Sequence, residues 1–178
     1  MKYFIISLLC LCILFPYDTL AQDDLDAKYA TDMLKPGTKA PAILSMSNGK
    51  TVNILTQDKA KYTILEFWAS WCGDCRHDMA TMRDINRTYA SDSIRIQGYS
   101  FDRDSTAWMR CVKDSVLTWA QALSPKQMRE SDVAKAYNVK WIPSYYLLKD
   151  GEVILSTVMV EKLQARLKEI APDAKSAK

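Results

Sequence analysis

The sequence predicts an α/β domain, with a mixed central sheet and helices on both faces. Residues 62–69, "YTILEFWA", form a continuous apolar run of the kind found in a strand buried on both faces. A helix with an apolar stripe is expected over 73–89, and an alternating strand over 93–101. Near the end, Asp150-Gly151 joins two further strands in a hairpin. A βαβ unit followed by a ββα unit implies a mixed sheet.

The chain begins with the pattern of a secretory signal. Lys2 gives a positive start, residues 3–15 are apolar apart from Ser7, and small residues end at Ala21. This order predicts a Sec-type signal peptide over 1–21 and a periplasmic or other extracytoplasmic location. The apolar run is shorter than the roughly 20 residues that span a bilayer. An uncleaved N-terminal membrane anchor is therefore the alternative.

Between the signal and the central strand, the sequence predicts a leader and a hairpin. Residues 22–35 are polar and read as a leader segment or short helix. Asn48-Gly49 is a hairpin turn signal, and residues 51–55 read as the second strand. We therefore expect an N-terminal β-hairpin extension at the start of one domain over 36–171.

The rest of the chain completes that domain. The helix over 73–89 has an apolar stripe that includes Met79 and Met82. Ser131 is the expected cap of a short helix that runs to Tyr137. The remaining elements are a helix over 105–116, two strands within 144–156, a closing helix over 161–171 and a flexible tail over 172–178.

Charge and cysteine content narrow the function. The net charge of +3 does not indicate a nucleic-acid partner. Cys10 and Cys12 lie within the signal, which leaves Cys72, Cys75 and Cys111 for the exported domain. A close pair can form a disulfide in an oxidising compartment. These cysteines are too few for a disulfide scaffold, so the close pair is free for another role.

The position of Cys72 indicates redox chemistry. It follows the buried strand where the next helix begins, and Cys75 lies one turn inside that helix. Unpaired N–H groups and the helix dipole stabilise a thiolate at such a position, which lowers the thiol pKa. Such a pair can cycle between dithiol and disulfide without unfolding the domain.

Other readings of the pair are weaker. A zinc site needs about four ligands, whereas the chain adds only His77 and the distant Cys111 to the pair, so we expect no metal. A crosslink across one helical turn closes too small a loop to stabilise much. We expect His77 to be solvated and Cys111 to be a packed thiol. The sequence implies no organic cofactor.

The motifs resemble the thioredoxin superfamily. "FWASWCGDC" after a β run, with "WIPSYYLLKDGEVI" far downstream, carries this resemblance. "GTKAPAILSMSNGKTVNIL" and the insert "SFDRDSTAWMRCVKDSVLTW" resemble the secreted TlpA/ResA-like branch. The resemblance covers about residues 36–171. It implies a thioredoxin fold with an N-terminal β-hairpin extension and a helical insert, and the activity of a thiol–disulfide oxidoreductase.

The resemblance also implies roles for individual residues. Cys72 matches the exposed attacking cysteine and Cys75 the resolving one. Pro143 matches a proline that follows a cis peptide bond and faces the pair, which leaves the backbone of Ile142 able to bind an extended substrate. Glu66 matches a buried acid beneath the pair. Its pKa should be raised by burial, and it could accept the proton of Cys75.

The residues around the pair suggest how it is tuned. Trp71 should pack beside the sulfurs and contact the substrate, together with Gly73 and Asp74. Between its two cysteines, thioredoxin itself has Gly-Pro where this chain has Gly73-Asp74. The charge of Asp74 should raise the thiolate pKa and make the pair a reductant, whereas Arg76 acts the other way. Asp78 matches a position that is acidic in ResA-like proteins.

These observations predict an exported reductase of protein disulfides. We expect a monomer that a membrane-bound thiol donor re-reduces. The resemblance suggests apocytochromes as substrates, and so a role in cytochrome c maturation. Two alternatives stay open: a disulfide oxidase or isomerase, and a non-catalytic binding module that keeps the fold. A measured reduction potential distinguishes a reductase from an oxidase or isomerase. A disulfide-reduction assay distinguishes a reductase from a non-catalytic module.

Overall fold

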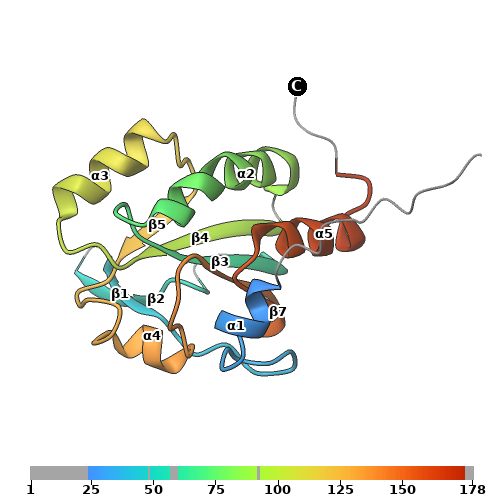
Figure 1. Ribbon diagram of the computed structural model, residues 1–178, viewed down its shortest axis with the longest axis horizontal. Coiled ribbons are helices and arrows are strands. Elements are labelled where there is room, and N and C mark those ends of the chain that lie inside the picture. Colours follow the sequence, from blue (N-terminus) through green and yellow to red (C-terminus); the bar gives the residue numbers. More distant parts are fainter. Residues whose placement is uncertain (1–23, 48, 57–59, 92, 175–178) are drawn as a thin grey trace, which may run out of the picture.

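The computed structural model of the protein describes residues 24–47, 49–56, 60–91 and 93–174 (Figure 1). The signal peptide expected over 1–21 lies outside the described residues, as does the end of the tail expected over 172–178. Within the described ranges, no helix has both the length and the apolar character needed to cross a membrane.

A five-stranded mixed sheet forms the centre of the fold, with the strand order β5-β4-β3-β6-β7. The central strand β3 (Tyr62–Trp68) runs parallel to β4 (Ile94–Ser100) and antiparallel to β6 (Ser144–Lys149). The edge strand β5 (Ala120–Leu123) is parallel to β4, and β7 (Glu152–Thr157) is antiparallel to β6. The predicted mixed sheet is confirmed.

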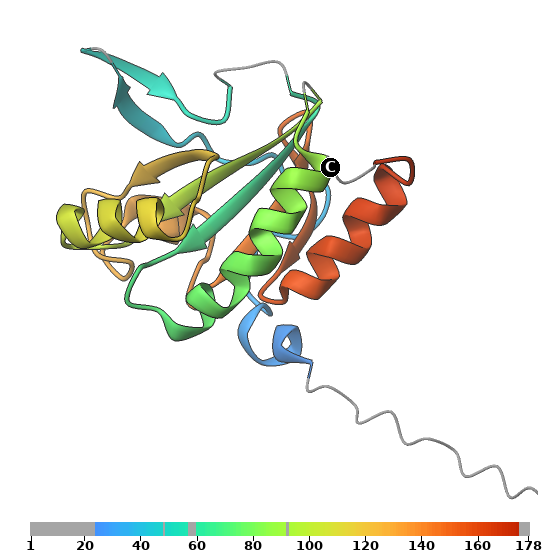
Figure 2. The same ribbon diagram turned by 90° about the horizontal axis from the view of Figure 1, so that it is seen from above.

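Helices cover both faces of this sheet, as predicted (Figures 1 and 2). One face carries α2 (Gly73–Tyr89), α3 (Ser105–Asp114) and α5 (Val160–Ile170). The short helices α1 (Leu25–Tyr29) and α4 (Asp132–Ala136) lie on the other side. The face that carries α2 is the one on which the site is built.

The N-terminal segments comprise a hairpin and a leader, and the leader is hydrogen-bonded to the core. The predicted hairpin is present as β1 (Leu44–Ser47) paired antiparallel with β2 (Lys50–Asn53). In α1, the carboxylate of Asp26 accepts hydrogen bonds from the Thr157 hydroxyl and the Val158 N–H, at 2.8 and 2.7 Å. The leader is thereby fixed where β7 ends and α5 begins.

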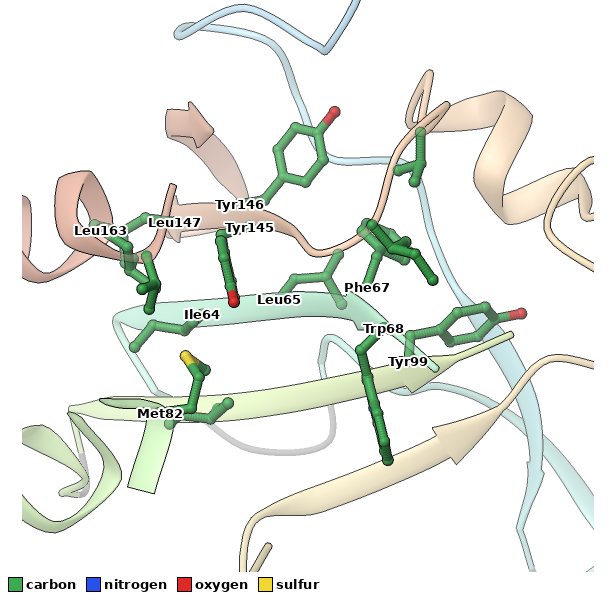
Figure 3. Close-up of a cluster of buried hydrophobic side chains, with 14 of the residues drawn as sticks. Ile64, Leu65, Phe67, Trp68, Met82, Tyr99, Tyr145, Tyr146, Leu147 and Leu163 are labelled. Carbon is green, nitrogen blue, oxygen red and sulfur yellow. The ribbon is translucent and has the colours of Figure 1, made fainter. Parts of the chain in front are cut away.

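The core lies on both faces of β3 (Figure 3). On the α2 side, Met82 packs among buried aliphatic side chains such as Ile64. On the opposite side, the ring of Phe67 is 5.3 Å from that of Tyr137 and 6.0 Å from that of Tyr146. Because successive side chains of a strand point to opposite faces, Glu66 faces the α2 side with Trp68.

One strand differs from the sequence prediction. The helical insert is present as α3, but it ends at Asp114, and the chain then reverses through Val116, whose φ is +54°. It continues into β5, which the sequence analysis did not predict. The segment "AQAL" lacks β-branched and aromatic residues, so its strand conformation comes from pairing with β4 rather than from local preference.

Candidate active site

Cys72 and Cys75 form a disulfide at the start of α2. Their Cα atoms are 5.3 Å apart. Cys72 is the N-cap of α2, and its sulfur accepts a hydrogen bond from the N–H of Cys75 at 3.1 Å. The sulfur therefore occupies the position at which a helix N-terminus stabilises negative charge.

The exposure of Cys72 differs from what we expected. Its exposed fraction is 7%, against 1% for Cys75, so the expectation of an exposed attacking sulfur is wrong for the disulfide form. The carbonyl oxygen of Ile142 lies 3.6 Å from Cys72 Sγ. The asymmetry still has the expected direction, because Cys72 is the more accessible of the two.

The segment Ile142-Pro143 has the backbone conformation that the family resemblance implies. The Ile142–Pro143 peptide bond is cis. Pairing between β3 and β6 begins at Phe67 and Ser144, so Ile142 precedes the ladder. Ser144 anchors the turn by donating its hydroxyl to the carbonyl of Trp141 at 2.7 Å.

Asp102 anchors the loop that leads into the disulfide. Its buried carboxylate accepts hydrogen bonds from the N–H of Ser70 at 2.9 Å and from the Ser70 hydroxyl at 2.5 Å. It accepts a third from the Ser100 hydroxyl at 2.6 Å. Asp102 was not among the site residues predicted from the sequence. The available signal was an acid just past the end of the strand over 93–101, beside the edge at which β3 also ends.

Glu66 is a buried acid, as expected. It is 2% exposed, and burial raises its pKa to about 8 from an ordinary 4.5. The indole of Trp119 lowers this pKa in part, whereas the charge of Asp78 raises it further. The indole N–H does not reach hydrogen-bond geometry: neither Glu66 Oε2 nor Trp119 Nε1 has a hydrogen-bond partner among the described residues. Glu66 is therefore poorly solvated as an anion.

Glu66 belongs to a row of residues that crosses the sheet. Its strand partners are Tyr145 on β6 and Gly98 on β4, and Gly98 is in turn the partner of Gln121 on β5. A Cβ atom on Gly98 would lie 2.1 Å from Gln121 Oε1. The missing side chain thus makes room for Gln121, which accepts a hydrogen bond from Trp68 Nε1 at 3.1 Å.

Asp78 is the second acid on this side of the sheet. It lies one helical turn beyond Cys75, with a side chain that is 16% exposed, and it accepts a hydrogen bond from the Tyr145 hydroxyl at 2.9 Å. Burial raises the pKa of Asp78, the hydrogen bond from Tyr145 lowers it, and the charge of Glu161 raises it again. His77 is solvated, as expected, with a side chain that is 82% exposed.

Two clefts are lined by residues that adjoin the cysteines in the sequence. The first, of about 210 Å³, is lined by Asp74, Asp78, Pro143 and neighbouring residues of α5. The second is lined by Trp71, which is 60% exposed, together with Arg103 and Arg129. No heavy atom lies within 4 Å of where a Cβ of Gly73 would be. Of the residues expected to bind substrate, Trp71, Asp74 and Pro143 line these clefts, whereas Ile142 is buried and lines neither. Within the described ranges, no three potential metal ligands cluster.

This geometry predicts unequal reactivity of the two cysteines. After mild reduction, iodoacetamide should alkylate Cys72 at least about tenfold faster than Cys75, because Cys72 is at the helix N-terminus and is the more accessible. Peptide mapping by mass spectrometry after timed quenching measures both rates. Equal rates, or faster labelling of Cys75, would reverse the roles assigned to the pair.

Comparison with known proteins agrees with this geometry. The family model described as Redoxin matches residues 35–170. The chain is 28% identical over 146 residues to the thiol-disulfide oxidoreductase ResA of Bacillus thuringiensis, covering 79% of this chain and 82% of that protein. It is 25% identical over 132 residues to the sporulation thiol-disulfide oxidoreductase A of Bacillus subtilis, covering 72% of this chain and 78% of that protein.

A solved structure gives the same result. The C-terminal domain of a putative thiol-disulfide oxidoreductase from Bacteroides thetaiotaomicron is similar with a TM-score of 0.69 and 27% identity, covering 79% of this chain and 98% of that one. The sheet order, the cysteine pair at the start of α2 and these relatives point to one assignment. The chain belongs to the Redoxin family, in the TlpA/ResA-like branch of the thioredoxin superfamily, and is a thiol–disulfide oxidoreductase.

Proposed function

We propose that the protein is an exported reductase of protein disulfides, with Cys72 as the attacking cysteine and Cys75 as the resolving one. One observation carries the proposal: the disulfide lies at the N-terminus of α2, and its sequence neighbours Trp71 and Asp74 each line a cleft that a polypeptide substrate could occupy. Asp74 between the sulfurs adds negative charge, which favours a reducing pair.

The reaction proceeds in two exchanges. The Cys72 thiolate attacks one sulfur of the substrate disulfide, the other substrate sulfur leaves, and a mixed disulfide forms. Cys75 then attacks Cys72 Sγ, loses its proton and expels the remaining substrate sulfur as a thiolate. The substrate disulfide gains two electrons and the pair loses two, which leaves the Cys72–Cys75 disulfide.

Glu66 acts on the second exchange. As a carboxylate it can accept the proton of Cys75 as that sulfur attacks. Since its pKa is about 8 in the disulfide form, Glu66 is mostly protonated at pH 7. When a donor thiolate later attacks Cys72, Glu66 can return this proton to the departing Cys75 sulfur. One acid thus serves both directions of the cycle.

The setting of the reaction is also part of the proposal. A signal at 1–21 would deliver a domain over 36–171 to the periplasm or another extracytoplasmic space, where a membrane-bound thiol donor re-reduces the pair. The protein would act as a monomer. Apocytochrome cysteines are the first substrates to test, because ResA-like proteins are the relatives that match.

A reduction potential tests the direction of electron flow. Equilibration of the pair with glutathione or dithiothreitol buffers should give a value near that of thioredoxin, about −270 mV. A value near −120 mV would make the protein an oxidant instead. An insulin-reduction assay with dithiothreitol tests the other alternative, since a non-catalytic module would not accelerate reduction.

Asp74 offers a test of how the pair is tuned. Asp74→Asn removes a negative charge between the cysteines, so the Cys72 thiolate is stabilised and the potential should become less negative by about 10–30 mV. Asp84→Asn is the matched control, because Asp84 is an exposed acid of the same helix, paired with Arg87 far from the sulfurs. An unchanged potential in Asp74→Asn would show that its charge is screened.

A further inference from the structure

Two adjacent tyrosines of β6 point to opposite faces of the sheet (Figure 3). Both Tyr145 and Tyr146 are fully buried. The Tyr146 hydroxyl lies on the α4 side, where it accepts a hydrogen bond from the N–H of Leu34 and donates one to the carbonyl of Tyr137. The Tyr145 hydroxyl lies on the α2 side and donates to Asp78 Oδ2. Of these two tyrosines, only Tyr145 therefore donates a hydrogen bond to an acid beside the disulfide.

Tyr145 lies between Glu66, which is buried, and Asp78, which lines a cleft. It is the strand partner of Glu66, and directly opposite side chains on antiparallel strands have Cβ atoms about 4.5–5.5 Å apart. Glu66 is 2% exposed and does not line the cleft, whereas Asp78 does line it. A proton that reaches Glu66 must leave a buried site, and Asp78 is the neighbouring acid with access to water.

We propose that Tyr145 is a positioning residue, whose hydroxyl holds the Asp78 carboxylate next to Glu66 and so sets the pH range in which the site releases the proton of Cys75. This inference rests on the proposed function. Cys75 loses its proton to the Glu66 carboxylate as the new S–S bond forms. At a pH that favours the Glu66 carboxylate, the proton then passes to the Asp78 carboxylate and to water, whereas at lower pH Glu66 keeps the proton for the departing Cys75 sulfur.

The charges around Asp78 make the Tyr145 hydrogen bond important. Asp74 and Glu161 raise its pKa from α2 and α5, and burial raises it more, whereas His77 lowers it. Glu66 faces the same region from β3. The Tyr145 hydroxyl is the main contact that favours the charged form of Asp78. Without this hydroxyl, Asp78 should stay protonated to a higher pH and stop accepting protons.

Tyr145→Phe removes the hydroxyl and keeps the ring. Stopped-flow experiments measure the rate of mixed-disulfide resolution as a function of pH. The acid limb, which is the pH range in which this rate rises, should move to higher pH by about one pH unit, the scale of a lost hydrogen bond to a carboxylate. Tyr146→Phe is the matched control, since it removes a buried hydroxyl from the next residue on the opposite face. It should lower stability and leave the limb in place.

A second variant keeps the test decisive if Tyr145→Phe does not fold. Asp78→Asn changes a half-buried residue and removes the carboxylate that the Tyr145 hydroxyl holds, so it should move the same acid limb, and Tyr145→Phe should add no further shift in that background. An unmoved limb in folded Tyr145→Phe or in Asp78→Asn overturns the inference, as does an equal shift in Tyr146→Phe. The same traces report attack by Cys72. If attack fails in the unmodified protein, the proposed function falls, whereas normal attack with an unmoved limb removes only the role of Tyr145.

Discussion

Replacing Cys72 with serine should abolish catalytic reduction of disulfides, with a loss of roughly 10³-fold or more in turnover. A serine hydroxyl is not ionised near neutral pH, so it cannot replace the thiolate that the N-terminus of α2 stabilises. Cys75 is 1% exposed and cannot take over the attack on a protein substrate. Insulin reduction in dithiothreitol measures the loss.

Cys111 provides the matched control. It lies on α3 as a half-buried free cysteine, with its sulfur 3.9 Å from the Ser115 hydroxyl, and burial raises the pKa of its thiol. Cys111→Ser should keep turnover within about twofold of the unmodified protein, because this residue lies outside the proposed exchange. Retained turnover in Cys72→Ser, or its loss in Cys111→Ser, would mean that the reactive cysteine has been misassigned.

Glu66→Gln should slow the resolution of the mixed disulfide by about 10²-fold, the usual scale for a lost general base. Attack by Cys72 should change much less, because that sulfur is stabilised by the helix N-terminus rather than by Glu66. In the unmodified protein, resolution should accelerate up to about pH 8 as Glu66 ionises, and the variant should lack this rise. Stopped-flow traces separate the two steps. Equal slowing of both, or of neither, would make Glu66 a structural acid.

The same variant should alter stability in a defined pH window. The pKa of Glu66 is about 8 in the folded protein and 4.5 ordinarily, so the unfolded chain ionises first as pH rises. The folded protein therefore loses stability between these two values. Glu66→Gln has no such loss, so its advantage should grow across the window to about 1 kcal/mol or more at pH 8. Urea unfolding at pH 5 and pH 8 measures the difference.

Local patterns were sufficient to predict most of the fold. The apolar run that became β3 and the apolar stripe that became the buried face of α2 are strong periodic signals, and together they place Cys72 at a helix N-terminus. Asp150-Gly151 likewise gives the turn between β6 and β7, with φ of +51° and +80°. Glu66 was singled out because it matches a buried acid of the family that the motifs resemble.

Features that depend on tertiary contacts were not predictable in this way. The strand β5 forms because β4 offers an edge, and its own sequence carries little preference for it. Cys72 has low exposure and contacts the carbonyl oxygen of Ile142, which is 70 positions away in the sequence. The hydrogen bond from Tyr145 to Asp78 joins residues 67 positions apart. Neither residue signals this contact, since a tyrosine in a buried strand usually serves packing.

The most direct test of the central claim is to identify the sulfur that carries the substrate. Reduced Cys75→Ser protein, mixed with a peptide disulfide, should accumulate a stable mixed disulfide because the resolving thiol is missing. Mass spectrometry of the digested adduct should locate the peptide on Cys72. No adduct under conditions in which dithiothreitol reduces the peptide, or an adduct on Cys111, would contradict the assignment of Cys72 as the attacking cysteine.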